Sequence, residues 1–286
     1  MSERLTREAP AKVNLFLRVL AREQDGHHSI ETLFCRLALA DTVTVERRPG
    51  RGVTLEVDGP DLGPPEQNLA VRAAAAVLGA TGDRFAVHLT LTKRIPVQAG
   101  LGGGSSDAAG TLDAVNQLAG NAVPRHELFH FAARIGADVP FFLSGAPLAL
   151  AWGRGERIVR LAPLPSAPVL LLVPPVGVPT AEAYRWMDQA KAGTGPRGAL
   201  ALELDSLSRW SDVARMAGND FESAVFGREQ TIRDAFEAVA RTNPQLCRMS
   251  GSGSTIFGVY RTGSDRDAAR LTLGKKLGTP IATDTA

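Results

Sequence analysis

The segment PVQAGLGGGSSDAAG, residues 96–110, decides how the rest of the chain is interpreted. It places four glycines and two serines in seven consecutive positions, 100–106, and then continues directly into alanines. Ser105 and Ser106 are predicted to cap a helix whose apolar stripe is Ala108, Ala109, Leu112, Val115 and Leu118. The first N–H groups of a helix lack intrahelical partners and carry partial positive charge, and glycines leave them open to a ligand. The segment therefore predicts a loop that binds phosphate.

The glycine spacing excludes the two commonest nucleotide motifs. No lysine follows the glycines, as a P-loop requires, and Ser105 stands where a G-x-G-x-x-G motif needs its third glycine. A serine-capped glycine turn without a ligand is the alternative interpretation. Asp107 also argues against phosphate, unless its carboxylate points away or lies near a metal ion.

Composition favours an untargeted soluble protein with two lobes. The 286 residues suffice for two domains of ordinary size. The formal net charge is only +2, from 32 basic and 30 acidic residues, which argues against a nucleic acid or a membrane surface as partner. Cys35 and Cys247 are too few and too far apart for a disulfide framework or a metal site. No apolar run approaches the roughly 20 residues that span a bilayer, so we expect a protein of the reducing cytoplasm.

Alternation of apolar and polar residues predicts the first strand at 12–19, KVNLFLRV. Lys12, Asn14, Phe16 and Arg18 are expected on one face, so Lys12 and Asn14 project the same way. Further strands are predicted at 42–47, 53–57, 85–92, 147–152, 157–161, 169–173 and 255–260. Further helices are predicted at 69–78, 124–136, 181–190, 199–206, 221–226, 229–241 and 265–277.

This order of elements favours an α+β fold over a doubly wound parallel sheet, because the strands occur in runs and do not alternate strictly with helices. The segment LAPLPSAP, residues 161–168, lies between two predicted strands and is rich in proline and alanine. It is the predicted domain boundary.

Lys12 and Asp138 are the candidate pair for phosphoryl transfer. Transfer to a hydroxyl needs a carboxylate that accepts the proton and a cation that offsets the developing charge, usually together with magnesium. Asp138 follows a helix that we expect to end at Gly136, and Pro140 is expected to keep Val139 extended, which predicts a fixed loop. A turn-forming aspartate and a solvated strand lysine are the alternatives.

The glycine-rich loop resembles the phosphate loop of the GHMP kinases, the family of galactose, homoserine, mevalonate and phosphomevalonate kinases. In that family the loop has the form P-x-x-x-G-L-G-x-S-S-x-A-A with small insertions. The resemblance covers nearly the whole chain in the family's order, through APAKVNLFLRVLAREQDGHHSIETLF (9–34), NLAVRAA (68–74), GADVPFFLSG (136–145), GNDFE (218–222) and MSGSGSTIFG (249–258). These segments are similar to the branch that phosphorylates a cytidine diphosphate-linked polyol.

The resemblance implies a two-lobed α+β fold. Residues 1–163 are expected to form a ribosomal-protein-S5-like lobe that binds ATP and carries the catalytic residues, and residues 164–286 a ferredoxin-like lobe that completes the substrate site. The implied activity is the ATP- and Mg²⁺-dependent phosphorylation of the 2-hydroxyl of a cytidine diphosphate-linked methylerythritol, in the non-mevalonate route to isoprenoid precursors. We expect a cytoplasmic monomer or weak dimer without nucleic-acid or membrane partners.

Catalytic and ATP-binding residues follow from the resemblance position by position. Asp138 is expected to accept the proton of the 2-hydroxyl, Lys12 to steady the carboxylate and the developing charge, and Asn14 to hold the diol. Asn68 and Lys93 are expected near the adenosine. The phosphate loop comprises Pro96, Val97, Gln98, Ala99, Gly100, Leu101, Gly102, Gly103, Gly104, Ser105 and Ser106, of which Ser106 is the candidate to reach magnesium.

The cytidine end is implied in the same way. The family has a tyrosine that stacks on cytosine and then a histidine that binds its polar edge, and this chain has His27 and His28 there. His27 departs from the pattern, although an imidazole can also stack on a base. Thr180 and Tyr184 match the opposite wall. The glycines at 251–254 are expected to border the diphosphate, with an ordinary turn as the alternative.

Two rival functions stay open. Another kinase of the same family would act on mevalonate, homoserine or a sugar, but these acceptors carry no base for His27, His28 and Tyr184 to bind. A nucleotide-binding module without catalysis would need only the phosphate loop, which leaves the pairing of Lys12 with Asp138 without a purpose.

Overall fold

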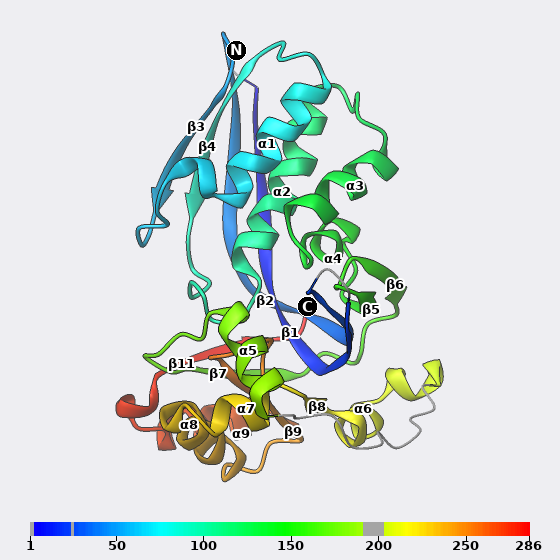
Figure 1. The fold of residues 1–286 in the computed structure, drawn as a ribbon. Helices are drawn as coiled ribbons and strands as arrows, with labels where there is room; N and C mark the ends of the chain where they lie inside the picture. The colour runs from blue at the N-terminus through cyan, green and yellow to red at the C-terminus, as the bar shows by residue number, and fades with distance from the viewer. Residues whose placement is uncertain (1–2, 24–25, 191–202) are drawn as a thin grey trace.

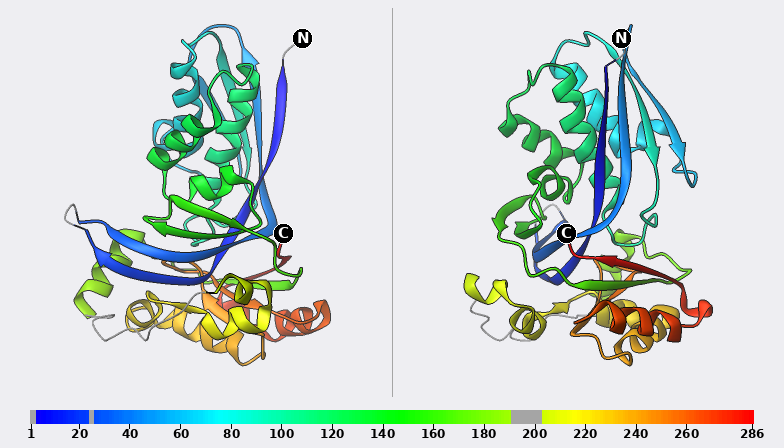
Figure 2. Two further views of the ribbon diagram at one scale, coloured as in Figure 1. Left: turned by 90° about the vertical axis from the view of Figure 1, so that its right-hand side faces the viewer. Right: turned by 180° about the vertical axis from the view of Figure 1, so that it is seen from behind.

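A computed structural model describes residues 3–23, 26–190 and 203–286. Figure 1 shows two lobes, the upper with helices packed on a long sheet and the lower with helices beneath a smaller sheet. The two longest strands, β1 (Arg4–Arg22) and β2 (His28–Arg48), belong to both. Figure 2 shows that they run down the upper lobe and then bend to lie along the lower one.

The upper lobe is built on a seven-stranded sheet with the order β3-β4-β2-β1-β8, in which β5 pairs with β2 and β6 with β5. Helices α1 to α4 cover one face of the sheet (Figure 1). Their alanines and leucines pack on alternate residues of the strands, as an amphipathic layer requires. The additional elements are β3 (Val53–Asp58), β4 (Ala86–Thr92), β5 (Leu148–Gly153), β6 (Arg157–Leu161), β8 (Gly218–Asn219), α1 (Leu69–Ala80), α2 (Gly103–Leu118), α3 (Arg125–Ile135) and α4 (Val139–Ser144).

The lower lobe has the ferredoxin-like arrangement. Its antiparallel sheet has the order β11-β7-β10-β9, which is 4-1-3-2 when these strands are numbered along the chain. The elements are β7 (Pro168–Val173), α5 (Thr180–Ala190), α6 (Trp210–Met216), α7 (Glu222–Phe226), α8 (Gln230–Ala240), β9 (Leu246–Met249), β10 (Ile256–Val259), α9 (Gly263–Thr272) and β11 (Thr279–Asp284). The predicted α+β class and its two lobes are confirmed.

Strand β7 shows how the lobes are held together. Val169 and Leu171 pack in one cluster with Val13 and Leu15 of β1, whereas Leu170 packs in the cluster that contains α7 and α8. Both faces of β7 are therefore buried, which explains its uninterrupted apolar sequence. The junction between the lobes is a continuous hydrophobic core.

Most predicted strands and helices are confirmed to within one or two residues, and the differences have local causes. Residues 4–11 and 20–22 extend β1 and residues 28–41 extend β2 beyond the predicted strands, and β8, β9, β11, α4 and α6 were not predicted. The helix expected at 265–277 ends at Thr272, and a 3-10 turn at Lys275–Leu277 follows Gly274. The helix expected at 199–206 begins outside the described residues, and its described end belongs to a 3-10 turn, Leu204–Ser208.

Three local predictions are wrong. Helix α2 begins at Gly103, with Gly102 in the left-handed conformation at its N-cap, so neither serine caps it. Val139 is not extended but opens α4, because a proline in the first turn loses no hydrogen bond. A β-bulge between Asn14 and Phe16 moves Phe16 into the core, away from the face of Lys12.

The two glycine-rich segments cross where the lobes meet. Ser250 Oγ donates to the carbonyl of Gly100 over 2.9 Å, and the Thr255 N–H donates to the carbonyl of Ala99 over 3.3 Å. A Cβ atom on Gly100, whose φ is +77°, would lie 2.2 Å from the Ser250 carbonyl oxygen. Only glycine allows this approach of two backbones.

We predict that Gly100→Ala lowers the free energy of unfolding by about 2 kcal/mol or more, because the methyl group must displace the backbone of the opposite loop. Urea denaturation measures the loss. Gly82→Ala is the matched control, since Gly82 has nearly the same φ, +80°, with no atom within 4 Å of an added Cβ. The control loses only the cost of a left-handed alanine, about 1 kcal/mol. Equal losses in the two variants would contradict the close crossing.

Candidate active site

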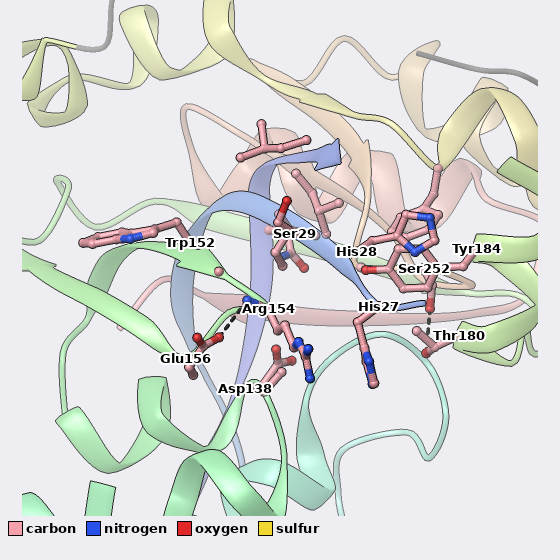
Figure 3. Close-up of a pocket in the computed structure, with 18 of the residues that line it drawn as sticks. His27, His28, Ser29, Asp138, Trp152, Arg154, Glu156, Thr180, Tyr184 and Ser252 are labelled. Carbon is pink, nitrogen blue, oxygen red and sulfur yellow. Dashed lines mark hydrogen bonds between the residues drawn. The ribbon is translucent and has the colours of Figure 1, made fainter. Parts of the chain in front are cut away.

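A cavity of about 1500 Å³ lies where the two lobes meet, and Figure 3 shows the side chains that converge on it. Strands β1, β2 and β5, helix α5, the turn before α4 and both glycine-rich segments contribute to its wall. The fold brings together there the predicted residues Lys12, Asn14, His27, His28, Gly100, Gly102, Asp138, Thr180 and Tyr184.

Lys12 lies on β1 with only 4% of its side chain exposed. Its Nζ atom donates to Asn14 Oδ1 over 2.7 Å and lies 3.4 Å from Asp138 Oδ2. The ring of Phe34 lies beneath it, with Nζ 5.3 Å from the ring centroid. A charged amine so far from water needs such partners, and the alternative of a solvated strand lysine is wrong.

Asn14 is oriented by a chain of hydrogen bonds from β2. Its Nδ2 atom donates to Thr32 Oγ1 over 2.8 Å, and the Thr32 hydroxyl donates to the Phe16 carbonyl over 2.7 Å. This chain fixes the amide so that its oxygen faces Lys12. Thr32 was not predicted from the sequence, because only the pairing of β1 with β2 places its hydroxyl beside Asn14.

Asp138 precedes α4 in right-handed backbone conformation but makes no side-chain cap with that helix. Its side chain is 27% exposed and points into the cavity (Figure 3), and its Oδ2 atom lies 3.4 Å from Lys12 Nζ. The alternative interpretation of Asp138, a turn-forming residue, requires its carboxylate to bond to the local backbone. The carboxylate makes no such cap.

The phosphate loop is wedged between β1 and α4. A Cβ atom on Gly102 would lie 2.9 Å from the ring of Phe142 and 3.1 Å from Lys12 Cγ, and the Lys12 N–H donates to the Leu101 carbonyl over 3.0 Å. The start of α2 therefore adjoins Lys12, with no side-chain cap on its first N–H groups. These N–H groups form a site suited to an anion.

The two serines at the start of α2 have different surroundings. Ser106 is buried, and its hydroxyl has no hydrogen-bond partner among the residues that the structure describes. Ser105 Oγ lies 3.8 Å from the position of a Cβ on Gly136, in the turn that leads to Asp138. Ser105 is therefore the serine that faces the turn leading to Asp138. Capping preferences do not distinguish it from Ser106. The contact of Ser106 with a metal stays a prediction.

Lys93 belongs to a buried ionic cluster. Its Nζ atom lies 2.5 Å from Asp107 Oδ2 and also donates to Asp41. Burial raises the pKa of Asp107 to about 6, although Lys93 opposes this shift. Burial lowers the pKa of Lys93, but both carboxylates act in the opposite direction and leave the pKa above its usual value.

This cluster changes two expectations. Asp107 points into the protein toward Lys93, which answers the objection that its charge would repel phosphate. The ammonium group of Lys93 faces the same interior, so it does not extend toward an adenosine as expected. Asn68 lies at the start of α1, where its Oδ1 atom accepts from the Ala70 N–H over 2.9 Å.

The aromatic end of the cavity is partly closed. The His28 ring stacks on Tyr184 with 4.5 Å between centroids and 13° between planes, which leaves no room for a base between them. His28 Nε2 lies 3.0 Å from Asp188 Oδ1, a partner that sequence spacing did not indicate. Burial, followed by the charge of Asp138, raises the pKa of Tyr184 to about 12. His27 points into the cavity separately (Figure 3).

The second glycine cluster completes the wall. Asn219 Nδ2 donates to the carbonyls of Met249 (2.8 Å) and Gly251 (2.7 Å), and Thr180 Oγ1 lies 3.1 Å from Ser252 Oγ. A Cβ on Gly251 would lie 3.6 Å from Lys12 Nζ. This turn is therefore part of the site and not an isolated connection between strands.

Arg154 also points into the cavity, although sequence reasoning did not select it (Figure 3). Its guanidinium, just after β5, donates to the Glu23 carboxylate, just after β1, over 2.7 Å. The only sequence signal was a turn with alternating glycine and charge, GRGER at 153–157.

The described residues contain no group of three or more His, Cys, Asp or Glu side chains that could hold a metal ion. None of their helices combines the length and apolarity needed to cross a membrane.

The sequence and fold match known kinases. Residues 68–146 match the model for the GHMP kinases N terminal domain. The 4-diphosphocytidyl-2-C-methyl-D-erythritol kinase of Solibacter usitatus (strain Ellin6076) is 38% identical over 268 residues, which are 91% of this chain and 81% of that protein. That of Deinococcus radiodurans is 38% identical over 94% of this chain and 88% of its own length.

Solved structures agree. A crystal structure of 4-(cytidine 5'-diphospho)-2C-methyl-D-erythritol kinase superposes with a TM-score of 0.81 and 36% identity over 99% of both chains. The homoserine kinase of Cytophaga hutchinsonii, at 19% identity and a TM-score of 0.69 over 100% of this chain and 94% of its own, shares the fold. The chain therefore belongs to the 4-diphosphocytidyl-2-C-methyl-D-erythritol kinases of the GHMP kinase family.

Proposed function

We propose that this kinase transfers the γ-phosphate of ATP to the 2-hydroxyl of 4-diphosphocytidyl-2-C-methyl-D-erythritol and releases ADP. The observation that carries the proposal is the distance of 3.4 Å between Lys12 Nζ and Asp138 Oδ2, beside the uncapped start of α2. A proton acceptor, a cation and a phosphate site are the parts that phosphoryl transfer to an alcohol requires.

Asp138 accepts the proton of the attacking hydroxyl in this mechanism. Lys12 pairs with the carboxylate before the reaction and offsets negative charge on the phosphoryl oxygens during it. Asn14 holds the acceptor diol, since its amide is already fixed by Thr32. In this proposal the transfer is direct and in line, without a phosphoenzyme.

Magnesium fits this site as a companion of the nucleotide. Mg²⁺ in kinases is commonly bound by substrate phosphates, water and only one or two protein oxygens. The hydroxyl of Ser105 or Ser106, at the start of α2, is the protein oxygen that we propose for it. When bound, the ion neutralises charge on the phosphates.

The cytidine group is proposed to occupy the end of the cavity with His27, His28 and Tyr184. Because His28 and Tyr184 already contact each other, the base stacks against this pair on the cavity side, near His27. The amino and carbonyl groups of cytosine then meet His28 and backbone groups. The glycines at 251–254 border the diphosphate.

Three expectations from the sequence are part of this proposal and are consistent with the activity. They are a division into lobes at residues 163/164, a cytoplasmic location, and a monomer or weak dimer. Membership of the GHMP kinases implies ATP as the phosphate donor.

The activity itself is tested by measuring ADP release with three acceptors. Release with the cytidylylated methylerythritol, and not with mevalonate or homoserine, is the expected result. Release with mevalonate or homoserine instead would identify another kinase of the family. Binding of ATP without acceptor-dependent ADP release would favour a nucleotide-binding module.

Asp138→Asn is predicted to lower kcat by roughly 10²–10⁴-fold, because the amide cannot accept the hydroxyl proton. The dissociation constant of ATP should change less than about twofold, as Asp138 is not part of the phosphate loop. Steady-state kinetics and calorimetric titration of ATP measure the two effects. Asp113→Asn, on the outer side of α2 and paired with Arg7, is the control and should retain wild-type kcat. A turnover of Asp138→Asn close to wild type would remove Asp138 from the role of base.

His27→Ala and Tyr184→Ala are predicted to raise the KM of the cytidine substrate about tenfold and that of ATP less than twofold. Each loses about 1 kcal/mol or more of aromatic contact with the base. Tyr184→Phe retains the ring and serves as the matched control, with a KM close to wild type. A parallel rise for both substrates would place the base elsewhere.

A further inference from the structure

A buried ionic cluster contacts both ends of the phosphate loop. It consists of Asp41 on β2, Lys93 just after β4, and Asp107 on α2. The side chains are almost completely buried, and Lys93 Nζ contacts both carboxylates. None of the three lines the cavity, so the proposed catalytic mechanism leaves the cluster unused.

The cluster holds the incoming end of the loop. Asp41 Oδ1 accepts hydrogen bonds from the N–H groups of Arg94 (2.5 Å) and Ile95 (2.8 Å), the two residues before Pro96. A carboxylate that binds two consecutive N–H groups restricts the backbone strongly. The loop therefore leaves β4 in one fixed direction.

The same cluster holds the outgoing end of the loop. Asp107 lies in α2 just beyond Ser106, and its Oδ2 atom is 2.5 Å from Lys93 Nζ. Gly103 rests on the cluster, since a Cβ there would lie 3.3 Å from Asp41 Oδ2 and 3.1 Å from Ile95 Cγ2. The ion pairs thus hold the first turn of α2, whose N–H groups form the anion site, in one position.

Charge and burial make this arrangement costly unless it is complete. Two buried carboxylates repel each other, and one shared ammonium group must compensate both. Apolar side chains would fill the same volume more simply. An ionic bridge instead supplies directional bonds to three separate segments of the chain.

We infer that Asp41, Lys93 and Asp107 form a unit that positions the phosphate loop for ATP, by fixing both ends of the loop through one lysine. This inference rests on the proposed function in taking ATP as the ligand of the loop. The three residues act through the loop backbone and do not touch the nucleotide. Without the ionic bridge the loop is less ordered in the free enzyme. ATP must then order the loop when it binds, and this cost lowers the ATP affinity.

Asp107→Ala and Asp107→Asn test the inference. The asparagine variant still accepts a hydrogen bond from Lys93, whereas the alanine variant does not. We expect Asp107→Ala to weaken ATP binding at least tenfold and Asp107→Asn less than threefold, measured by calorimetric titration of ATP without acceptor. The acceptor KM should change less than twofold in both.

Val115→Ala is the control for lost stability, because Val115 is buried in α2 but is not part of the cluster. Its ATP affinity should remain close to wild type even if its melting temperature falls as far as that of Asp107→Ala. Wild-type ATP affinity in Asp107→Ala would overturn the inference. So would tighter ATP binding in both Asp107 variants, since Asp107 would then only repel phosphate.

The readout separates this inference from the proposed function. ATP affinity is measured without acceptor and does not depend on which alcohol is phosphorylated. Absence of acceptor-dependent ADP release in the wild type contradicts the function, whereas a loss of ATP affinity confined to Asp107→Ala still supports the positioning unit.

Discussion

The structure depends on one buried ammonium group, that of Lys12. Its charge must be compensated away from water, and the compensation comes from Asn14 on the same strand and Asp138 before α4. The backbone of the same residue binds the phosphate loop, and the second glycine cluster lies against the amine. The position of one lysine thereby relates the proposed base, the proposed phosphate site and the cavity wall to a single strand.

The glycines of the phosphate loop allow close packing between segments and do not make the loop flexible. At Gly100 and Gly102 the missing side chain lets the backbone of one loop lie against the other loop, Phe142 and Lys12. A ligand-free glycine turn would have no reason to be packed so closely. The loop is rigid because its surroundings fix it, and an anion site made of backbone N–H groups is effective only when those groups are fixed beforehand.

The sequence predicted those parts of the site that depend on local pattern. The period of β1 placed Lys12 beside Asn14, and the glycine and serine content of residues 100–106 indicated the helix start. Contacts between distant segments could not be predicted from the sequence. They include the side-chain bonds of Asn14 with Thr32, of His28 with Asp188, and of Lys93 with Asp107. The bulge that moved Phe16 into the core likewise arises from pairing with β2, which no single strand encodes.

Strands β1 and β2 pass through the junction without a break, and the core between the lobes is continuous around them. Hinged enzymes bend at short connectors, but here a bend would have to distort a paired ribbon along with the packing that covers it. The two halves should accordingly unfold in one cooperative transition. Changes of acceptor during divergence are then easiest on α5, where replacements leave the shared ribbon untouched, and exchange of whole lobes by recombination is disfavoured.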